Sequence, residues 1–237
     1  MVSGAAWPLR WWLILVGSVL TAVIVAGGLT LSGRGASTDS AAGSAAGAAS
    51  LRLAGLSVTD RRAERSDYQR AAFGAAWTDA VTVTGGGNGC DTRNDVLARD
   101  LVDVRRAVVD SCPDAVVAGE FRSPYTGEFI AFRRDRRPGA VQIDHIVPLA
   151  YAWDMGAWAW PQTARMNLAN DPANLVAADA ASNLTKSDQA PAEWMPPNRR
   201  FHCQYVTQFV MVMAAYQLPV DRRSRDVMAQ VLRSCGA

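Results

Sequence analysis

Histidine is scarce in this chain, with only two among 237 residues, His145 and His202. This scarcity excludes sites that need several imidazoles, such as a His-rich zinc or copper centre or a metalloprotease helix with paired histidines. The four cysteines contain no Cys-x-x-Cys pair, which argues against a zinc ribbon or a thioredoxin-like redox site. Any imidazole chemistry in this protein must therefore use one of two residues.

Strong charge of either sign is also missing. The chain has 24 Lys plus Arg against 22 Asp plus Glu, a net charge of +2, and Lys186 is its single lysine. A sum so close to neutral neither supports nor excludes a nucleic-acid footprint, which depends on local clustering. With 49% hydrophobic and 19% charged residues, the composition is that of a globular domain with accessory segments.

The N-terminal part differs from the rest. Residues 11–31 carry no charge, and about 20 apolar residues suffice to span a bilayer, more than the usual core of a signal peptide. We expect residues 1–31 to be a signal-anchor, or alternatively a cleaved signal peptide. Both place the remaining chain outside the cytoplasm, either membrane-anchored by one N-terminal helix or secreted. The Ala/Gly/Ser-rich residues 32–50 predict a flexible linker, and residues 51–237 form the folded domain.

The four cysteines of the exported part predict disulfides. Three pairings are possible, and sequence alone does not decide among them. We favour Cys90 with Cys112 and Cys203 with Cys235, because each pair closes a short local loop around a predicted helix.

Hydrophobic periodicity and turn residues predict a mixture of helices and strands. A capped helix should begin near Asp91 or Thr92, with apolar residues at helical spacing as far as Leu101 and Val104. A hairpin is expected at 116–132, around a turn at 123–127. The further expected elements are a strand at 141–145, a helical segment at 150–170 broken at Pro161, a strand at 174–178, and helices at 179–186, 199–217 and 221–234.

One ordered set of residues carries the chemistry. Asp144-His145 is followed by Ile-Val-Pro-Leu, then Asn174-Leu175, and then Ser-Asn-Leu-Thr-Lys at 182–186. In this order the chain resembles the HNH, or ββα-metal, endonucleases. Within them it is most similar to exported bacterial HNH endonuclease-like proteins related to the C-terminal domain of GmrSD-type restriction enzymes. The segments 89–95, 124–127 and 194–198 also look like that branch.

The resemblance implies an α+β fold in which a ββα-metal finger, at about 141–186, is embedded in a disulfide-stapled helical domain. In the family pattern His145 is the general base, and Asp144 and Asn183 bind one divalent ion, Mg²⁺ or another such as Mn²⁺. Asn174 matches the family's middle Asn, which ties the loop after His145 and orients the imidazole. The implied substrate is DNA, possibly RNA, and no protein partner can be inferred.

The chemistry of phosphodiester hydrolysis agrees with these residue types. The reaction needs a base near neutral pH to deprotonate water, and a neutral imidazole suits that task. It also needs positive charge at the phosphate and at the departing oxygen. Carboxylate and amide oxygens are ligands that suit Mg²⁺, with water and substrate phosphate completing its coordination.

Each assignment has a simpler alternative. Lys186, about one helical turn beyond Asn183, is a candidate phosphate contact or an ordinary surface charge. Arg136 and Arg137 belong to a basic turn that either binds substrate or is merely solvated. His202, beside Cys203 on an apolar helix, is assigned to packing.

Two other functions remain open. The small net charge and single lysine fit a non-catalytic extracytoplasmic module that keeps the fold and binds nucleic acid or a protein. The same residue set also fits a metal-assisted phosphoesterase acting on a small substrate.

Overall fold

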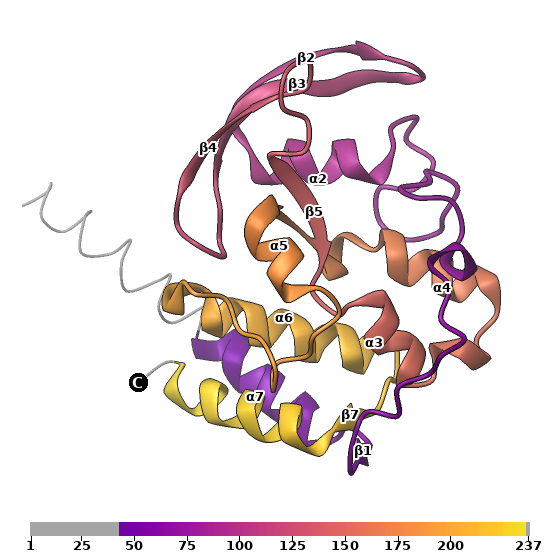
Figure 1. The fold of residues 1–237 in the computed structure, drawn as a ribbon, viewed down its shortest axis with the longest axis vertical. Coiled ribbons are helices and arrows are strands. Elements are labelled where there is room, and N and C mark those ends of the chain that lie inside the picture. The colour runs from indigo at the N-terminus through magenta and orange to yellow at the C-terminus, as the bar shows by residue number, and fades with distance from the viewer. Residues whose placement is uncertain (1–42, 236–237) are drawn as a thin grey trace, which may run out of the picture.

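A computed structural model describes residues 43–235 of the chain (Figure 1). Within this range the fold combines helices with three small β-sheets, of strand order β1-β7, β2-β3-β4 and β5-β6. The expected signal segment at 1–31 lies outside the described residues. Among residues 43–235, no helix has the length and apolar character needed to cross a bilayer.

The elements follow one another in an order that mixes helices and strands throughout. After a helix at residues 43–54 they are β1 (Val58–Thr59), η1 (Arg70–Phe73), α2 (Thr92–Asp100), β2 (Val102–Val109), β3 (Cys112–Arg122), β4 (Phe129–Arg133), β5 (Val141–His145), α3 (Leu149–Asp154), η2 (Ala157–Ala159), α4 (Gln162–Asn170), η3 (Pro172–Asn174), β6 (Leu175–Asp179), α5 (Ala180–Lys186), η4 (Arg199–Phe201), α6 (His202–Ala215), β7 (Val220–Asp221) and α7 (Arg222–Ser234).

The largest sheet is an antiparallel meander of β2, β3 and β4, seen at the top of Figure 1. The expected hairpin at 116–132 is confirmed, because β3 and β4 pair from Ala118↔Arg133 to Arg122↔Phe129. Its turn closes where the Gly127 N–H donates to the Ser123 carbonyl at 2.7 Å. Gly127 has φ 82°, a conformation that glycine adopts without a Cβ clash.

The helix before this sheet begins as expected but ends earlier. The Asp91 carboxylate caps α2 by accepting the Asn94 N–H at 2.7 Å. The spacing of Leu101 and Val104 predicts that the helix continues, whereas α2 ends at Asp100 and residues 102–109 form β2. This expectation was wrong because valines suit a pleated strand, and pairing with β3 supplies the backbone hydrogen bonds.

The strands β5 and β6 pair antiparallel over five residues, from Val141↔Asp179 to His145↔Leu175. α5 follows β6 directly, and the Asp179 carboxylate caps it by accepting the Ser182 N–H at 2.8 Å. The expected strands at 141–145 and 174–178 and the helix at 179–186 are thus confirmed, with shifts of one residue. α3, η2, α4 and η3 lie between the two strands in the chain.

This strand pair lies between two apolar cores. Ile143 and Leu175 pack with α2 and the three-stranded sheet. Val176 and Ala178 pack with the helical part of the molecule. Because both faces are covered, every residue of β6 is buried. The end of β5 is therefore held firmly in place.

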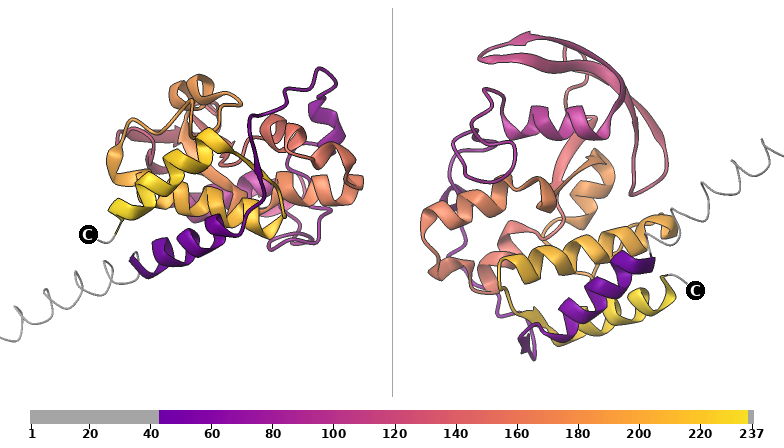
Figure 2. Two further views of the ribbon diagram at one scale, coloured as in Figure 1. Left: turned by 90° about the horizontal axis from the view of Figure 1, so that it is seen from below. Right: turned by 180° about the vertical axis from the view of Figure 1, so that it is seen from behind.

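The helix at residues 43–54 lies alongside α6 and α7, as both views of Figure 2 show. Ala46, Ala49 and Leu53 are buried in the same core as those helices. The flexible linker expected over 32–50 therefore does not extend through its described part, residues 43–50. Alanine is the best helix former, and its small side chain permits close packing, which composition alone does not reveal.

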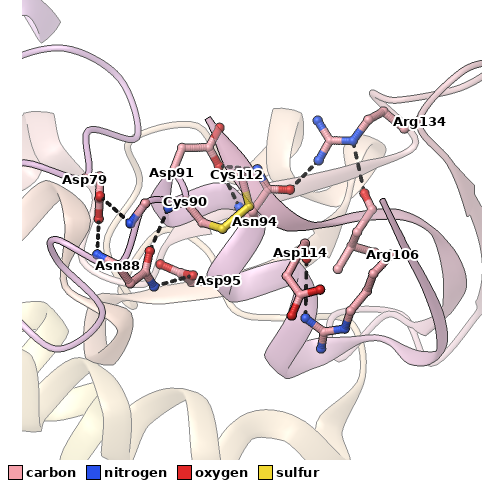
Figure 3. Close-up of a disulfide and its surroundings, with 12 residues drawn as sticks. Asp79, Asn88, Cys90, Asp91, Asn94, Asp95, Arg106, Cys112, Asp114 and Arg134 are labelled. Atoms are coloured by element: carbon pink, nitrogen blue, oxygen red, sulfur yellow. Dashed lines mark hydrogen bonds between the residues drawn. A yellow bond between two sulfur atoms is a disulfide. The ribbon is translucent and has the colours of Figure 1, made fainter. Parts of the chain in front are cut away.

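Two disulfides fasten the fold, and they are the pairs that the sequence analysis favours. Cys90–Cys112 joins the loop before α2 to the first residue of β3, next to Asp91, the cap of α2 (Figure 3). Cys203–Cys235 joins the first turn of α6 to the residue after α7. Each bond therefore fixes the position of one helix relative to a neighbouring element.

Candidate functional site

The end of β5 opens onto a cavity of about 530 Å³. Three residues that the sequence singles out, Asp144, His145 and Asn183, line this cavity together. Arg70 and Arg93 also line it. The strand pair and α5 thus bring to one place residues that are distant in sequence.

His145 is held by contacts on its ring edge and on its ring face. Its Nε2 lies 2.9 Å from the Ala169 carbonyl oxygen at the end of α4. Because a carbonyl only accepts hydrogen bonds, Nε2 carries the proton and Nδ1 keeps the lone pair. The indole of Trp77 stacks on the imidazole, with ring centroids 5.6 Å apart and planes 10° apart. These contacts fix both the tautomer and the ring plane.

Burial keeps this imidazole neutral. His145 is 6% exposed. Its pKa is lowered from 6.5 to about 3, mainly by burial and also by the charges of Arg70 and Lys186, while the bond to Ala169 opposes the shift. His145 therefore remains unprotonated at pH values well below neutral. A neutral imidazole with a free lone pair is the form that a general base requires.

Asn174 joins the loop after His145 to the end of α4. Its Oδ1 accepts the Val147 N–H at 2.8 Å, and its Nδ2 donates to the carbonyls of Val147 and Leu168 at 3.3 and 3.2 Å. Leu168 precedes Ala169, the residue that bonds the imidazole. Asn174 is fully buried and does not line the cavity, so its connection to His145 runs through the Val147 loop and the end of α4.

Asp144 lies at the cavity wall, and both of its carboxylate oxygens contact donors of the protein. Lys186 Nζ lies 3.1 Å from Oδ1 and 2.9 Å from Oδ2. The hydroxyl of Tyr125, from the turn between β3 and β4, donates to Oδ2. Tyr125 is fully buried and packs edge-on against Trp194. Each carboxylate oxygen of Asp144 thus has at least one partner inside the protein.

Lys186 is not placed where a phosphate contact would be. Its side chain is 0% exposed, and Nζ also donates to the His145 carbonyl at 2.7 Å. Burial lowers the pKa of Lys186, while the charge of Asp144 raises it. Wherever the proton resides, this pair is neutral as a unit. The expected phosphate contact is corrected to a buried partner of Asp144, because the amine cannot reach solvent.

Asn183, on α5, lines the cavity. Its Nδ2 donates to Gln142 Oε1 at 2.7 Å, which orients the amide and leaves Oδ1 to face other partners. Within residues 43–235, no group of three or more His, Cys, Asp or Glu side chains is arranged to hold a metal. A carboxylate and an amide oxygen still suit a hydrated divalent ion, since Mg²⁺ retains several waters and uses few protein ligands.

Three other residues from the sequence analysis lie apart from the cavity. Arg136 and Arg137 lie between β4 and β5, and neither lines the cavity. The Arg136 side chain is 82% exposed and lies 3.8 Å from Asp135. His202 Nε2 lies 2.8 Å from the Pro196 carbonyl. This contact agrees with the packing role that the sequence predicts for His202.

Three residues of this site were not anticipated from the sequence. The partner of Asp144, Tyr125, belongs to a segment recognised only as a turn of the family pattern. Arg70 and Trp77 precede the first element that the sequence predicts in the folded domain, and no motif marks either residue. Only the folded chain brings Trp77 to His145, 68 positions later in the sequence.

Comparisons with known proteins identify the family of this chain. Residues 91–231, more than half of the chain, match the family described as GmrSD restriction endonucleases, C-terminal domain. An "Uncharacterized secreted protein" of the fungus Arthroderma benhamiae is 35% identical over 185 residues, covering 77% of this chain and 82% of that protein. No solved structure matches the chain. The chain belongs to the family of the GmrSD restriction endonuclease C-terminal domain.

Proposed function

We propose that this protein is an endonuclease of the HNH type, which hydrolyses phosphodiester bonds of DNA with the help of a divalent cation. The observation that carries the proposal is the environment of His145, a neutral imidazole with its Nε2–H on Ala169 and its ring on Trp77, at the wall of a cavity that also holds Asp144. Membership in a restriction endonuclease family supports a nuclease.

The proposed mechanism begins with His145. Nδ1 accepts a proton from a water molecule as the water oxygen attacks the phosphorus, and the P–O bond to the departing oxygen of the diester breaks. The resulting imidazolium keeps its Nε2–H bond to the Ala169 carbonyl, which stabilises the positive charge as it forms. Trp77 shields one face of the ring, and Asn174 keeps the loop and the Ala169 carbonyl aligned.

Asp144 and Asn183 are the residues that would hold the cation, through carboxylate and amide oxygens. A bound divalent ion supplies positive charge for the phosphate oxygens and for the departing oxygen. The partners of these side chains fix their orientation. Lys186 and Tyr125 hold the carboxylate, and Gln142 holds the amide.

The proposed site of action is outside the cytoplasm. Two disulfides are typical of an oxidising compartment. The relative from Arthroderma benhamiae is described as secreted. The uncharged run at residues 11–31 supports export as well. An external nuclease of this type would meet DNA that has already left a cell.

Cleavage of supercoiled plasmid tests the proposal. We expect nicked and linear products with Mg²⁺ or Mn²⁺, and none with EDTA. A chromogenic small phosphodiester, assayed in parallel, separates a nuclease from a phosphoesterase with a small substrate. Turnover of the small diester at a higher kcat/KM than plasmid would contradict the assignment to DNA. A parallel assay on single-stranded RNA decides which nucleic acid is preferred.

A non-catalytic binding module is the second candidate. The observation in its favour is that Lys186 already neutralises Asp144, so the carboxylate adds no net negative charge for a cation. This module would bind nucleic acid without cleaving it. Binding that survives Asp144→Ala, with no cleavage by the wild type in any divalent ion, would favour it.

A further inference from the structure

An arm of the chain that precedes the family domain, residues 70–77, lies against the catalytic histidine. The family match begins only at residue 91. The arm is firmly docked, since Phe73 is 2% exposed and Arg165 Nε donates to the Ala72 carbonyl at 2.9 Å. Gly74 has φ 85°, and a Cβ there would lie 2.6 Å from Met166 Cγ. Only glycine permits this close approach to α4.

The C-terminal end of the arm is fixed as well. Trp77 stacks on His145 and accepts the Thr92 N–H at its carbonyl oxygen, at 3.1 Å. The N-terminal end places Arg70 beside the same histidine. Arg70 and His145 both line the 530 Å³ cavity and an adjoining, largely apolar one of about 230 Å³. A group bound where the cavities meet would be within reach of both side chains.

The charges of the main cavity favour an anion. Both acidic residues in its wall already have basic partners. Asp144 pairs with Lys186, and Asp188 pairs at 2.7 Å with Arg62, which also pairs with Asp154 at 2.6 Å. The two cations that themselves line the cavity, Arg70 and Arg93, form no ion pair with any carboxylate of residues 43–235. Four cations, Arg62, Lys186, Arg70 and Arg93, thus stand against three carboxylates, Asp144, Asp154 and Asp188, which leaves a net charge of +1 around the cavity.

Arg93 and Arg70 differ in how many of their hydrogen-bond donors are already used within the protein. Arg93 donates through Nη2 to the carbonyls of Pro138 and Val141, both at 2.9 Å. Arg70 is exposed, and its contact is with the neutral hydroxyl of Tyr68. Its guanidinium thus keeps donors for a ligand in the cavity. The planar fork of arginine matches phosphate oxygens in a bidentate manner.

We propose that Arg70 is a substrate-binding residue that donates hydrogen bonds to the non-bridging oxygens of a DNA phosphate in this cavity. The inference rests on the proposed function for its ligand class, but the residue comes from outside the matched family domain. Arg70 thus makes the phosphate contact that the sequence suggests for Lys186, whose amine is buried. The docked arm thereby completes the site.

Binding of a fluorescein-labelled DNA duplex in EDTA, followed by anisotropy, tests Arg70 without cleavage. We expect Arg70→Ala to raise Kd about 10- to 100-fold, the range for losing hydrogen bonds to a charged group. The slope of log K against log salt concentration should become less steep by about 0.9, the contribution of one phosphate contact in duplex DNA. Arg70→Lys should lie between Arg70→Ala and the wild type, because it keeps the charge and loses the fork.

Arg105→Ala is the matched control, since Arg105 is exposed on β2 and lines neither cavity. It should bind within about twofold of the wild type, as expected for a surface arginine without a phosphate contact. Circular dichroism melting of all variants confirms that they fold. Equal affinity of Arg70→Ala and Arg105→Ala would overturn the proposal, as would a wild type that binds no duplex.

The plasmid assay separates this proposal from the proposed function. A wild type that binds DNA through Arg70 but never cleaves it would support the Arg70 contact and refute the nuclease. The opposite outcome is a wild type that cleaves plasmid while Arg70→Ala keeps the wild-type DNA affinity and the wild-type kcat/KM. That outcome would support the nuclease and refute the Arg70 contact. If the protein is a nuclease and Arg70 also binds the phosphate, kcat/KM for plasmid should fall about 10- to 100-fold in Arg70→Ala, because the same hydrogen bonds to a charged group are lost.

Discussion

Lys186 Nζ lies 2.9 Å from Asp144 Oδ2 and 2.7 Å from the His145 carbonyl oxygen, with its side chain completely buried. One side chain from the last residue of α5 thus holds two consecutive residues at the end of β5. This contact fixes the backbone at the point where Asp144 and His145 must face the cavity. It also compensates a carboxylate that is 6% exposed.

Lys186→Met should destabilise the fold strongly. Removing one partner of a buried ion pair leaves the other charge unpaired, and the typical cost is about 3–5 kcal/mol. Urea unfolding followed by circular dichroism measures the difference. The double variant Asp144→Asn/Lys186→Met is the control, because it removes both charges and should recover part of the loss. A single variant as stable as the wild type would show that the pair is not buried as described.

Asn174→Ala should lower kcat and stability together. The substitution leaves the Val147 N–H and the Leu168 carbonyl without their side-chain partner in the interior, at about 1–3 kcal/mol for each unsatisfied group. Because the proposal gives Asn174 a role in positioning His145 and Asn174 does not line the cavity, KM should change little. The control Asn167→Ala removes a contact with Thr82 at the surface of α4. An equal effect of the two variants on kcat would argue against a positioning role.

Acid should destabilise the protein through His145. Its pKa is lowered from 6.5 to about 3 in the folded state, so between these values the unfolded chain binds a proton that the folded protein does not. Stability should therefore be full above pH 6.5 and decline toward pH 3, by at most about 1.4 kcal/mol per pH unit from this group. Urea unfolding across this range should show a shallower decline in His145→Gln. Identical slopes in the two proteins would contradict a buried neutral imidazole.

Loss of either disulfide should weaken the fold. The bonds join residues 22 and 32 positions apart, and loop closure of this size corresponds to about 3–4 kcal/mol in the chain-entropy treatment. Cys90→Ser/Cys112→Ser and Cys203→Ser/Cys235→Ser should each lower the urea midpoint under non-reducing conditions. The wild type treated with a reducing agent should resemble the variants. No change in midpoint upon reduction would mean that the thiols are not paired.

Much of the fold could be predicted where local signals and burial agree. The caps Asp91 and Asp179, the turn at Gly127 and the strands around His145 all follow from turn chemistry and periodicity. Prediction failed where tertiary contacts decide. Val104 matches the helical spacing of the preceding residues, but it belongs to β2, which pairs with β3 instead. The alanines of residues 43–54 resemble a linker until their burial beside α6 is known.

The candidate site divides in the same way. Asp144, His145 and Asn183 follow from an ordered pattern along the chain, and the fold places all three at one cavity. The role of Lys186 could not be predicted, because burial of its amine depends on where α5 packs. Arg70 reaches the site only because Phe73 and Gly74 dock the arm on α4 and its neighbours. No local signal encodes such a long-range contact.

The most direct test of the account compares the two histidines of the chain. Purified wild type, His145→Ala and His202→Ala are each given supercoiled plasmid with Mg²⁺. We expect cleavage by the wild type and by His202→Ala, which changes a residue outside the cavity. We expect a loss of at least about 100-fold in His145→Ala, the usual contribution of a general base. Cleavage by His145→Ala at the wild-type rate would contradict the central claim.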